Sequence, residues 1–269
     1  MNKLKKTISL SNGVEMPRIG LGVWKIDDTR VFQTVSWALA ARYRHIDTAR
    51  AYGNEAGVGR GVHQSGLARN QLFLTTKLAI SDIFKPEKAF EESLRKLRVD
   101  YVDLYLIHWP FFGWKRAWSA LEKIYADGRA KAIGVSNFGI GHLRELKRRG
   151  GVMPMVNQIE LSPFLNRQRL VAHCQSLGIV VEAYSPLTRG KRLADQVLAD
   201  MARNYKKSPA QIMIRWGLQH DLVMIPKSTS ESHIKDNIDV FDFEIEKKDM
   251  QKLDALNENY TTLPGWSRG

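Results

Sequence analysis

The sequence repeatedly places a titratable or amide side chain at the end of a short apolar run. Asp47 ends one run, Lys77 and His108 end the next two, and Tyr52 follows Asp47 closely in the chain. Later runs carry or end in further polar side chains: Ser136, Asn137, Gln158, Glu160, Glu182, Tyr184, Lys227 and Ser228. Carboxylate, ammonium, phenol and imidazole groups transfer protons and stabilise developing charge when they are held together. If the fold gathers these residues, they form a site for acid–base chemistry with amides and hydroxyls beside it.

The elements that must position these residues are eight apolar runs, rich in Val, Ile, Leu and aromatic residues. This composition is typical of strands that are buried on both faces. The runs cover residues 18–24, 45–49, 72–78, 102–109, 132–137, 156–161, 179–186 and 223–228. Amphipathic stretches separate them; in one, Phe90, Leu94 and Leu97 recur at helical spacing.

Eight alternating strand and helix units predict an α/β fold, the (β/α)8 TIM barrel. A doubly wound parallel sheet is the competing layout, but it usually carries a glycine-rich turn after its first strand. The carboxyl ends of barrel strands meet at one rim, so we expect the polar side chains to converge there.

The two ends of the chain complete this layout. Residues 7–16 contain Asn12-Gly13, a two-residue turn signal, and predict a β-hairpin that caps the bottom of the barrel. One extra helix fits before the eighth strand, and one or two helices and a tail over residues 260–269 follow it. The sequence shows no linker, so we expect residues 1–269 to form a single domain.

The composition excludes several other classes of protein. The chain has 41 Lys and Arg against 28 Asp and Glu, a net charge of +13, but these residues are scattered and show no nucleic-acid-binding motif. The lone Cys174 excludes an intramolecular disulfide and fits a reducing compartment. No apolar run approaches the roughly 18–20 residues of a membrane helix, and no signal-peptide core is present. We expect a cytoplasmic protein with neither nucleic-acid nor membrane partners.

Short motifs in order along nearly the whole chain resemble those of the aldo-keto reductase family. They are GLGVW at 20–24, YRHIDTA at 43–49 with YGNE at 52–55, TTKL at 75–78, VDLYLIHWP at 102–110, IGVSNF at 133–138, NQIE at 157–160 and IPKS at 225–228. The short loops resemble the small bacterial reductases of the diketogluconate and methylglyoxal type. The resemblance implies an enzyme that reduces aldehydes and ketones to alcohols, with small dicarbonyls, keto sugars and aromatic aldehydes as substrates.

The resemblance further implies a catalytic tetrad of Asp47, Tyr52, Lys77 and His108. Tyr52 would donate a proton to the developing alkoxide. The Lys77 ammonium beside its oxygen would favour the phenolate and so make the phenol a better acid. Asp47 would pair with Lys77 and keep it charged, while neutral His108 would direct a ring N–H at the carbonyl oxygen.

The cofactor implied by the resemblance is NADP(H), bound without the glycine fingerprint of doubly wound folds. Gly20-Leu21-Gly22 lacks the third glycine of that fingerprint. Ser136, Asn137 and Gln158 would hydrogen-bond the nicotinamide carboxamide, and Tyr184 would stack on its ring. The pyrophosphate would follow Ser185, Pro186 and Leu187. The adenosine end would meet Lys227, Ser228, Thr229, Ser230, His233, Asp236 and Asn237.

One departure from the family pattern bears on cofactor choice. The family usually has Arg at the position of His233. Arg stacks on adenine and binds phosphate through two hydrogen bonds, whereas a neutral His brings less charge. We therefore expect a relaxed preference for NADP(H), with NAD(H) also used.

The substrate pocket is expected to be aromatic, with Trp24, Tyr52, His108 and Trp109 around the carbonyl group. Phe111, Phe112 and Trp114 either join this pocket or pack elsewhere, and Trp266 in the tail is a further candidate. Many relatives carry a Trp two residues after the catalytic Lys; here that position is Ala79, which should widen one wall.

Two alternative functions compete with the hypothesis of a carbonyl reductase. A metal-dependent barrel hydrolase would need His pairs at strand ends, but no His-x-His occurs and only His108 ends a strand, so we expect no metal site. A non-catalytic nucleotide-binding redox sensor or interaction protein on the same fold would not need all four residues of the tetrad. We expect an enzyme that acts as a monomer.

Overall fold

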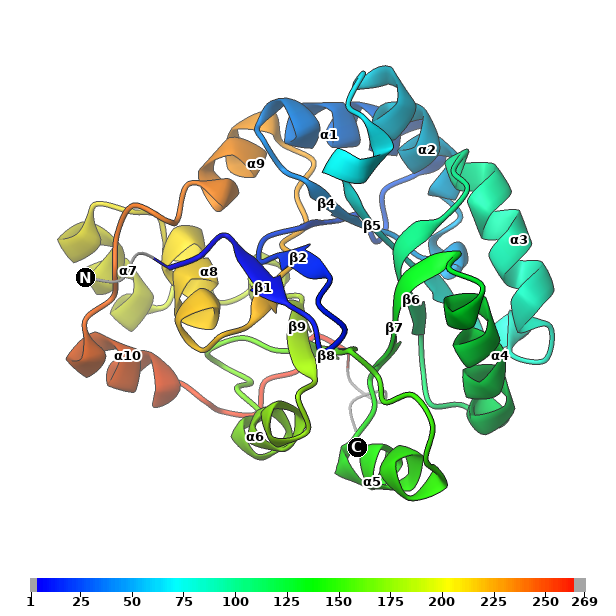
Figure 1. Cartoon of the computed structure of the whole chain (residues 1–269). Helices are drawn as coiled ribbons and strands as arrows, with labels where there is room; N and C mark the ends of the chain where they lie inside the picture. The colour runs from blue at the N-terminus through cyan, green and yellow to red at the C-terminus, as the bar shows by residue number, and fades with distance from the viewer. Residues whose placement is uncertain (1–3, 264–269) are drawn as a thin grey trace.

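Eight apolar segments pair in chain order into one parallel sheet in the computed structural model, which describes residues 4–263 (Figure 1). The strands are β3 Leu21–Gly22, β4 His45–Asp47, β5 Phe73–Leu78, β6 Val102–Ile107, β7 Ala130–Ser136, β8 Val156–Glu160, β9 Val180–Tyr184 and β10 Val223–Met224. A parallel bridge between Ile19 and Met224 joins the last strand to the first, with the Gly20 N–H donating to the Met224 carbonyl at 2.9 Å. The sheet therefore closes on itself, and the predicted (β/α)8 barrel is confirmed.

All eight predicted strands are present, but the two at the closure, β3 and β10, are only two residues long. Pro226 follows β10 and has no N–H to donate, so regular pairing cannot continue through it. Its carbonyl still accepts from the Gly22 N–H at 3.2 Å, which keeps the two segments side by side. The longer strands predicted over 18–24 and 223–228 are therefore irregular at this closure.

Helices surround the ring of strands, as Figure 1 shows. They are α1 Asp28–Ala40, α2 Glu55–Gln64, α3 Pro86–Leu97, α4 Trp114–Ala126, α5 Ile140–Arg149, α6 Gln168–Ser176, α7 Gln196–Tyr205, α8 Pro209–Gln219, α9 Glu231–Ile238 and α10 Lys247–Asp254. The pattern at 90–97 is confirmed in α3, where Phe90, Leu94 and Leu97 are all buried. The extra helix expected before the last strand is also present, since α7 and α8 both lie between β9 and β10.

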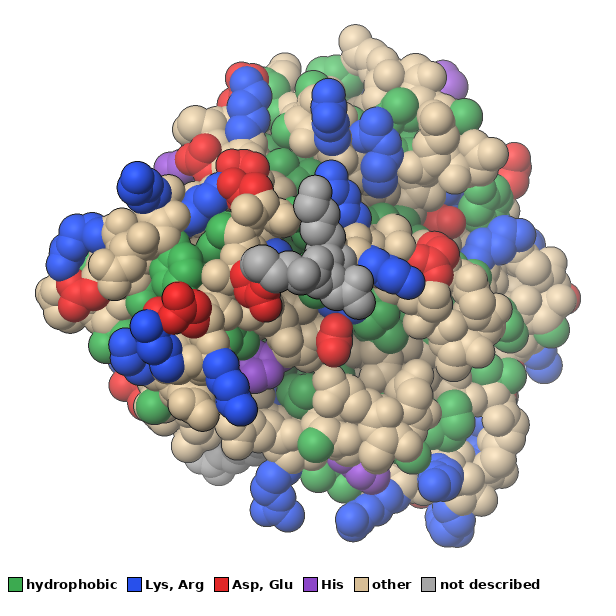
Figure 2. Space-filling model, turned by 60° about the vertical axis from the view of Figure 1, so that its left-hand side comes forward, with side chains coloured by type: hydrophobic (Ala, Val, Ile, Leu, Met, Phe, Trp, Pro, Cys, Tyr) green, Lys and Arg blue, Asp and Glu red, His purple; other side chains and the backbone are tan. Residues whose placement is uncertain are grey.

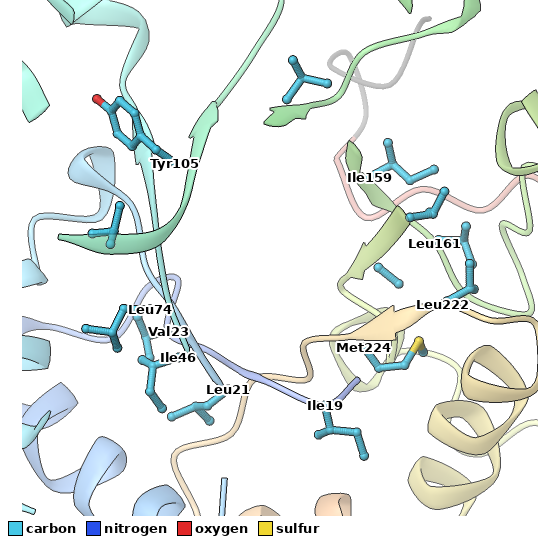
Figure 3. Close-up of a cluster of buried hydrophobic side chains, with 14 of the residues drawn as sticks. Ile19, Leu21, Val23, Ile46, Leu74, Tyr105, Ile159, Leu161, Leu222 and Met224 are labelled. Atoms are coloured by element: carbon cyan, nitrogen blue, oxygen red, sulfur yellow. The ribbon is translucent and has the colours of Figure 1, made fainter. Parts of the chain in front are cut away.

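The main hydrophobic core lies between the sheet and the helices. Leu21, Ile46 and Leu74 occupy paired positions on β3, β4 and β5, and their side chains lie next to one another on the outer face (Figure 3). Successive side chains of a strand point to opposite faces. Asp47 follows Ile46 directly, so its carboxylate points into the barrel, and Lys77 faces the same way because it lies an odd number of residues from Leu74.

The predicted hairpin closes one mouth of the barrel. It consists of β1 Thr7–Ser9 and β2 Glu15–Pro17, paired antiparallel, and lies across the ring in Figure 1. Its Leu10 and Met16 pack with Phe73 and Val156, the first residues of β5 and β8. These are the amino ends of the strands, so the hairpin caps the bottom of the barrel and leaves the carboxyl rim open.

The two-residue turn predicted for this hairpin is wrong. The Gly13 N–H donates to the Leu10 carbonyl at 2.9 Å, and the Leu10 N–H donates to Val14 at 2.8 Å, which makes a longer loop. A two-residue type I′ turn requires positive φ at both central positions, but of Asn12 and Gly13 only Gly13 has it, with φ of 85°. Asn12 instead donates through its side chain to the Lys131 carbonyl at 2.9 Å and ties the loop to the barrel.

The basic residues of the face drawn in Figure 2 are spread over it rather than gathered. Figure 2 shows Lys and Arg side chains scattered over one face, with acidic side chains among them. Among residues 4–263, no helix is both long and apolar enough to cross a membrane. Over the same residues, no three His, Cys, Asp or Glu side chains are grouped to hold a metal ion.

Candidate active site

A cavity of about 860 Å³ opens at the carboxyl rim of the barrel. This volume is in the upper part of the range for ligand pockets, about 300–1,000 Å³. Most of the expected site residues line it: Trp24, Asp47, Tyr52, His108, Trp109, Ser136, Asn137, Gln158, Tyr184, Ser185, Pro186, Leu187, Lys227, Ser228 and Thr229. Residues from seven strand ends therefore do converge in one place.

A buried ion pair lies at the floor of this cavity. The Lys77 Nζ is 2.6 Å from Asp47 Oδ1, and it also donates to the Thr48 carbonyl at 2.8 Å. Lys77 is fully buried. Burial lowers the pKa of Lys77, but Asp47 and Tyr52 together outweigh this effect and raise the pKa above its ordinary value. The ammonium thus stays charged inside the barrel, and its third N–H is directed at Tyr52.

The phenol of Tyr52 joins this pair from the short 3-10 helix Arg50–Tyr52. Its oxygen is 3.4 Å from Lys77 Nζ. Arg50 fastens the helix through ion pairs at 2.7 Å to both Asp82 and Glu92. Burial raises the pKa of Tyr52 and the Lys77 ammonium opposes it, so Lys77 acts in the expected direction but burial prevails. The phenol accordingly keeps its proton and remains able to donate it.

His108 stands beside Tyr52, with the two rings edge to face and their centroids 5.5 Å apart. Burial, together with the Lys77 ammonium, lowers the pKa of His108 to about 3. The imidazole is neutral at physiological pH and has a ring N–H to donate. The structure thus brings together all four residues of the proposed tetrad.

The two neutral histidines of the barrel predict an acid-sensitive fold. Burial lowers the pKa of both His45 and His108 from 6.5 to about 3. Between these values the unfolded chain binds protons that the folded chain does not, so the free energy of unfolding should fall as the pH drops from 6.5 toward 3. Urea unfolding at pH 7 and pH 5 measures this. Below pH 6.5, the slope of the unfolding free energy against pH should correspond to about one bound proton fewer in His108→Asn than in the wild-type protein. An equal loss of free energy in both proteins would contradict the assignment.

A chain of hydrogen bonds orders the polar residues above the tetrad. Tyr184 Oη donates to Asn137 Oδ1 at 2.8 Å, and the Asn137 amide donates to Ser136 Oγ at 3.0 Å and to the His108 carbonyl at 3.1 Å. Asn137 has φ of 64°, a left-handed conformation that Asn tolerates. A carbonyl oxygen accepts two hydrogen bonds, so Asn137 Oδ1 can take one more. This oxygen suits the NH2 group of a carboxamide.

Cationic side chains at the cavity fit the phosphates of a dinucleotide. Lys25, Arg189 and Lys227 all line it. Lys25 and Arg189 both contact Trp24, with Nζ 4.8 Å and Cζ 4.3 Å from the ring, respectively. Neither Lys25 nor Arg189 was anticipated from the sequence, although Lys25 directly follows Trp24 and Arg189 lies two residues after Leu187. Beside them, Ser185 adopts φ of 49°, which turns the chain after β9.

Only some of the residues expected to contact the adenosine end of the cofactor line the cavity. Lys227, Ser228 and Thr229 line the cavity, whereas Ser230, His233, Asp236 and Asn237 are not on its wall. Ser230 precedes α9, and on that helix His233 and Asp236 are exposed while Asn237 is buried. Burial and the nearby Arg30 lower the pKa of Lys227. Two neighbouring cations favour an anionic ligand here, and Arg30 was not anticipated from the sequence.

The wall around the expected carbonyl position combines aromatic and small residues. Trp24, Trp109 and Ala79 line the cavity, but Phe111, Phe112 and Trp114 do not. Phe111 and Phe112 are exposed, and Trp114 is buried against Phe138 and His142, so none of the three joins the pocket. Trp266 lies outside the described residues.

The C-terminal segment adds one wall residue that was not expected from the sequence. Leu263 lines the cavity. Glu160, at the end of β8, holds this segment by accepting hydrogen bonds from Thr261 Oγ1 at 2.6 Å and from the Thr262 N–H at 2.7 Å. Glu160 therefore acts on the pocket as an anchor for the chain that borders it.

Comparison with known proteins identifies the family. Residues 18–258 match the model of the aldo/keto reductase family. The chain is 48% identical to the glyoxal reductase of Bacillus subtilis, over 97% of this chain and 96% of the relative, and 43% identical to the methylglyoxal reductase DkgA of Escherichia coli, over 93% of each. It superposes on a Bombyx mori aldo-keto reductase solved in complex with NADP with a TM-score of 0.91, at 36% identity, covering 96% and 94% of the two chains. This chain belongs to the aldo/keto reductase family.

Proposed function

We propose that the protein reduces small aldehydes, dicarbonyl compounds and keto sugars to alcohols with NADPH, and that Tyr52 is the proton donor. As an aldo/keto reductase it is an NADP(H)-dependent oxidoreductase that acts on carbonyl groups. The observation that carries the assignment of Tyr52 is the triad Tyr52 Oη, Lys77 Nζ and Asp47 Oδ1, joined at 3.4 and 2.6 Å on the floor of the cavity. Relatives named as glyoxal and methylglyoxal reductases support the substrate class.

The chain's own residues handle the proton in this reaction. Bound NADPH supplies the hydride that the carbonyl carbon accepts. Tyr52 gives its phenolic proton to the carbonyl oxygen, and the Lys77 ammonium stabilises the phenolate that remains. Asp47 holds Lys77 in place and balances its charge, so the site gains no net charge before the reaction. The neutral His108 donates a ring N–H to the same oxygen and orients it. Solvent returns the proton to Tyr52 after the product leaves.

The residues of the cavity fit the nicotinamide, the pyrophosphate and the 2′-phosphate of the cofactor. Asn137 Oδ1 offers a free lone pair to the nicotinamide carboxamide, and Gln158 is placed to do the same. Tyr184 would present its ring to the nicotinamide. Lys25 and Arg189 would balance the pyrophosphate, and Lys227 with Arg30 would favour the 2′-phosphate.

The cofactor preference should be modest. Because His233 replaces the usual Arg, we expect kcat/KM with NADPH to exceed that with NADH by less than about a thousandfold, which corresponds to about 4 kcal/mol. His233→Arg should raise the preference for NADPH by about ten- to a hundredfold, because a charge-assisted contact to phosphate contributes about 1.5–3 kcal/mol. His233→Ala serves as the control and should change the ratio little. Initial rates with both cofactors test this; a wild-type preference well above a thousandfold would rule out the relaxed selectivity.

We also propose that residues 1–269 form one domain that acts as a monomer in the cytoplasm, without nucleic acid. A barrel closed by its own strands supports independent folding, and the scattered charge supports the absence of a nucleic-acid partner. The buried free Cys174 is in keeping with a reducing compartment. Sedimentation equilibrium of the purified protein should give a mass near 30.7 kDa.

A further inference from the structure

A second polar layer lies inside the barrel, adjoining the ion pair of the tetrad. Glu182 on β9 accepts a hydrogen bond from Gln158 Nε2 at 2.7 Å through Oε2. Its other oxygen, Oε1, is 3.5 Å from His45 Nε2, and that nitrogen is 3.1 Å from Thr75 Oγ1. Glu182, His45 and Thr75 are all fully buried, so this carboxyl group cannot exchange its partners for water. The proton transfers described above do not use it.

Gln158 connects this layer to the tetrad. Its Nε2 donates one hydrogen to Glu182 and the other to Asp47 Oδ2, the latter at 2.8 Å. An amide nitrogen has two hydrogens and no acceptor capacity, so two carboxyl groups on this side fix which end of the amide faces them. The carbonyl oxygen Oε1 must then face away, and Gln158 lines the cavity. Within residues 4–263, no hydrogen bond ends on Gln158 Oε1.

The geometry points to Glu182 as a positioning residue: it fixes the Gln158 amide so that the carbonyl oxygen, and not the NH2 group, faces the nicotinamide carboxamide. A carboxamide NH2 has two hydrogens, and the cavity then offers it two acceptors, Gln158 Oε1 and Asn137 Oδ1. Asp47 alone would satisfy only one Gln158 hydrogen. Without Glu182, the second hydrogen would be buried without an acceptor, which favours rotation of the amide. This inference rests on the proposed NADP(H) function and adds a residue to it.

The charge of the layer is consistent with this role. Burial and the adjacent Asp47 raise the pKa of Glu182 to about 8. This shift favours the protonated, neutral form of the Glu182 carboxyl group, and its charged or titratable neighbours are Asp47, Lys77, Tyr52 and the neutral His45 among the described residues. A neutral carboxyl group still accepts the Gln158 hydrogen bond through one oxygen. It thus orients the amide without upsetting the balance between Asp47 and Lys77.

The test compares binding of two cofactors that differ only in the group Gln158 would contact. Isothermal titration calorimetry measures the Kd of NADP+ and of its 3-acetylpyridine analogue, in which a methyl group replaces the carboxamide NH2. The wild-type protein should prefer NADP+. Glu182→Met, which removes the acceptor and keeps an unbranched side chain, should weaken NADP+ binding by about tenfold and leave the analogue nearly unchanged. Glu182→Gln retains an acceptor and should retain the preference.

Thr75→Val is the matched control, because Thr75 belongs to the same buried layer but does not contact Gln158. It should keep the wild-type preference between the two cofactors. If Glu182→Met also keeps that preference, Glu182 does not position Gln158 and the inference is wrong while the proposed function stands. If wild-type protein fails to bind NADP+ at all, the proposed function fails and this inference with it.

A measurement on the wild-type protein avoids dependence on the folding of Glu182→Met. Both Gln158 Nε2 hydrogens are donated inside the barrel, so its side-chain amide should give two separate NMR signals that exchange slowly with water. These signals are identified by their absence in Gln158→Leu. Rapid exchange of either hydrogen would overturn the inference, whatever the variants do.

Discussion

Tyr52→Phe is expected to lower kcat for carbonyl reduction by about a thousandfold, the usual scale of a general acid's contribution, and to leave the Kd for NADPH unchanged. The substitution removes only the phenolic oxygen that lies 3.4 Å from Lys77 Nζ. The ring remains, and with it the edge-to-face contact with His108. Absorbance of NADPH measures the rate, and fluorescence titration measures cofactor binding.

Tyr184→Phe is the matched control for this prediction. It removes a second phenolic oxygen from the same cavity, one that donates to Asn137 rather than reaching Lys77. Its kcat should fall far less than that of Tyr52→Phe. A Tyr52→Phe protein that retains more than about a tenth of wild-type kcat would remove Tyr52 from the role of proton donor.

Lys77→Met is expected to abolish turnover and also to reduce the free energy of unfolding by about 3–5 kcal/mol, because it leaves the Asp47 carboxylate buried without its partner. The double variant Asp47→Asn, Lys77→Met removes both charges. It should regain most of the lost stability, since replacing a whole buried pair is often nearly neutral, but it should stay inactive. Urea unfolding and NADPH consumption measure the two effects separately.

Lys235→Met provides the control for this comparison. Lys235 pairs with Glu231 on the surface of α9, with both side chains substantially exposed. Exposed pairs contribute about 0–1 kcal/mol, so this variant should be nearly as stable as the wild-type protein. If the double variant is no more stable than Lys77→Met alone, the cost does not come from the unpaired charge and the account of this ion pair is wrong.

Much of the fold could be predicted because the barrel strands have a composition of their own. The runs are mostly buried on both faces, and such burial favours predominantly apolar segments such as 102–107, in which Asp103 is the one charged residue. The short β10 could have been predicted from Pro226 in its run, whereas the short β3 could not, because it depends on contacts between the two ends of the sheet. The hairpin turn was misjudged for a similar reason: Asn12 uses its side chain to bind Lys131, far away in the chain.

Some residues of the site could likewise be predicted from the sequence, and others could not. Residues at strand ends, such as Asp47 and Lys77, could be placed because a parallel barrel brings all carboxyl ends to one rim. Lys25, Arg189 and Leu263 could not, because loops and the C-terminal segment bring them to the cavity, and their positions follow from tertiary contacts. Glu182 was visible as a polar residue in an apolar strand, but only its distances to Gln158 and His45 give it a role.

The most direct test of the central claim is NADPH oxidation by the wild-type protein with methylglyoxal, phenylglyoxal and a diketogluconate, read alongside NADPH binding. The account predicts that NADPH binds and is consumed only when a carbonyl compound is present, with alcohol formed in equal amount. NADPH that binds tightly and is consumed with none of these compounds would contradict the account and favour a nucleotide-binding sensor on the same barrel.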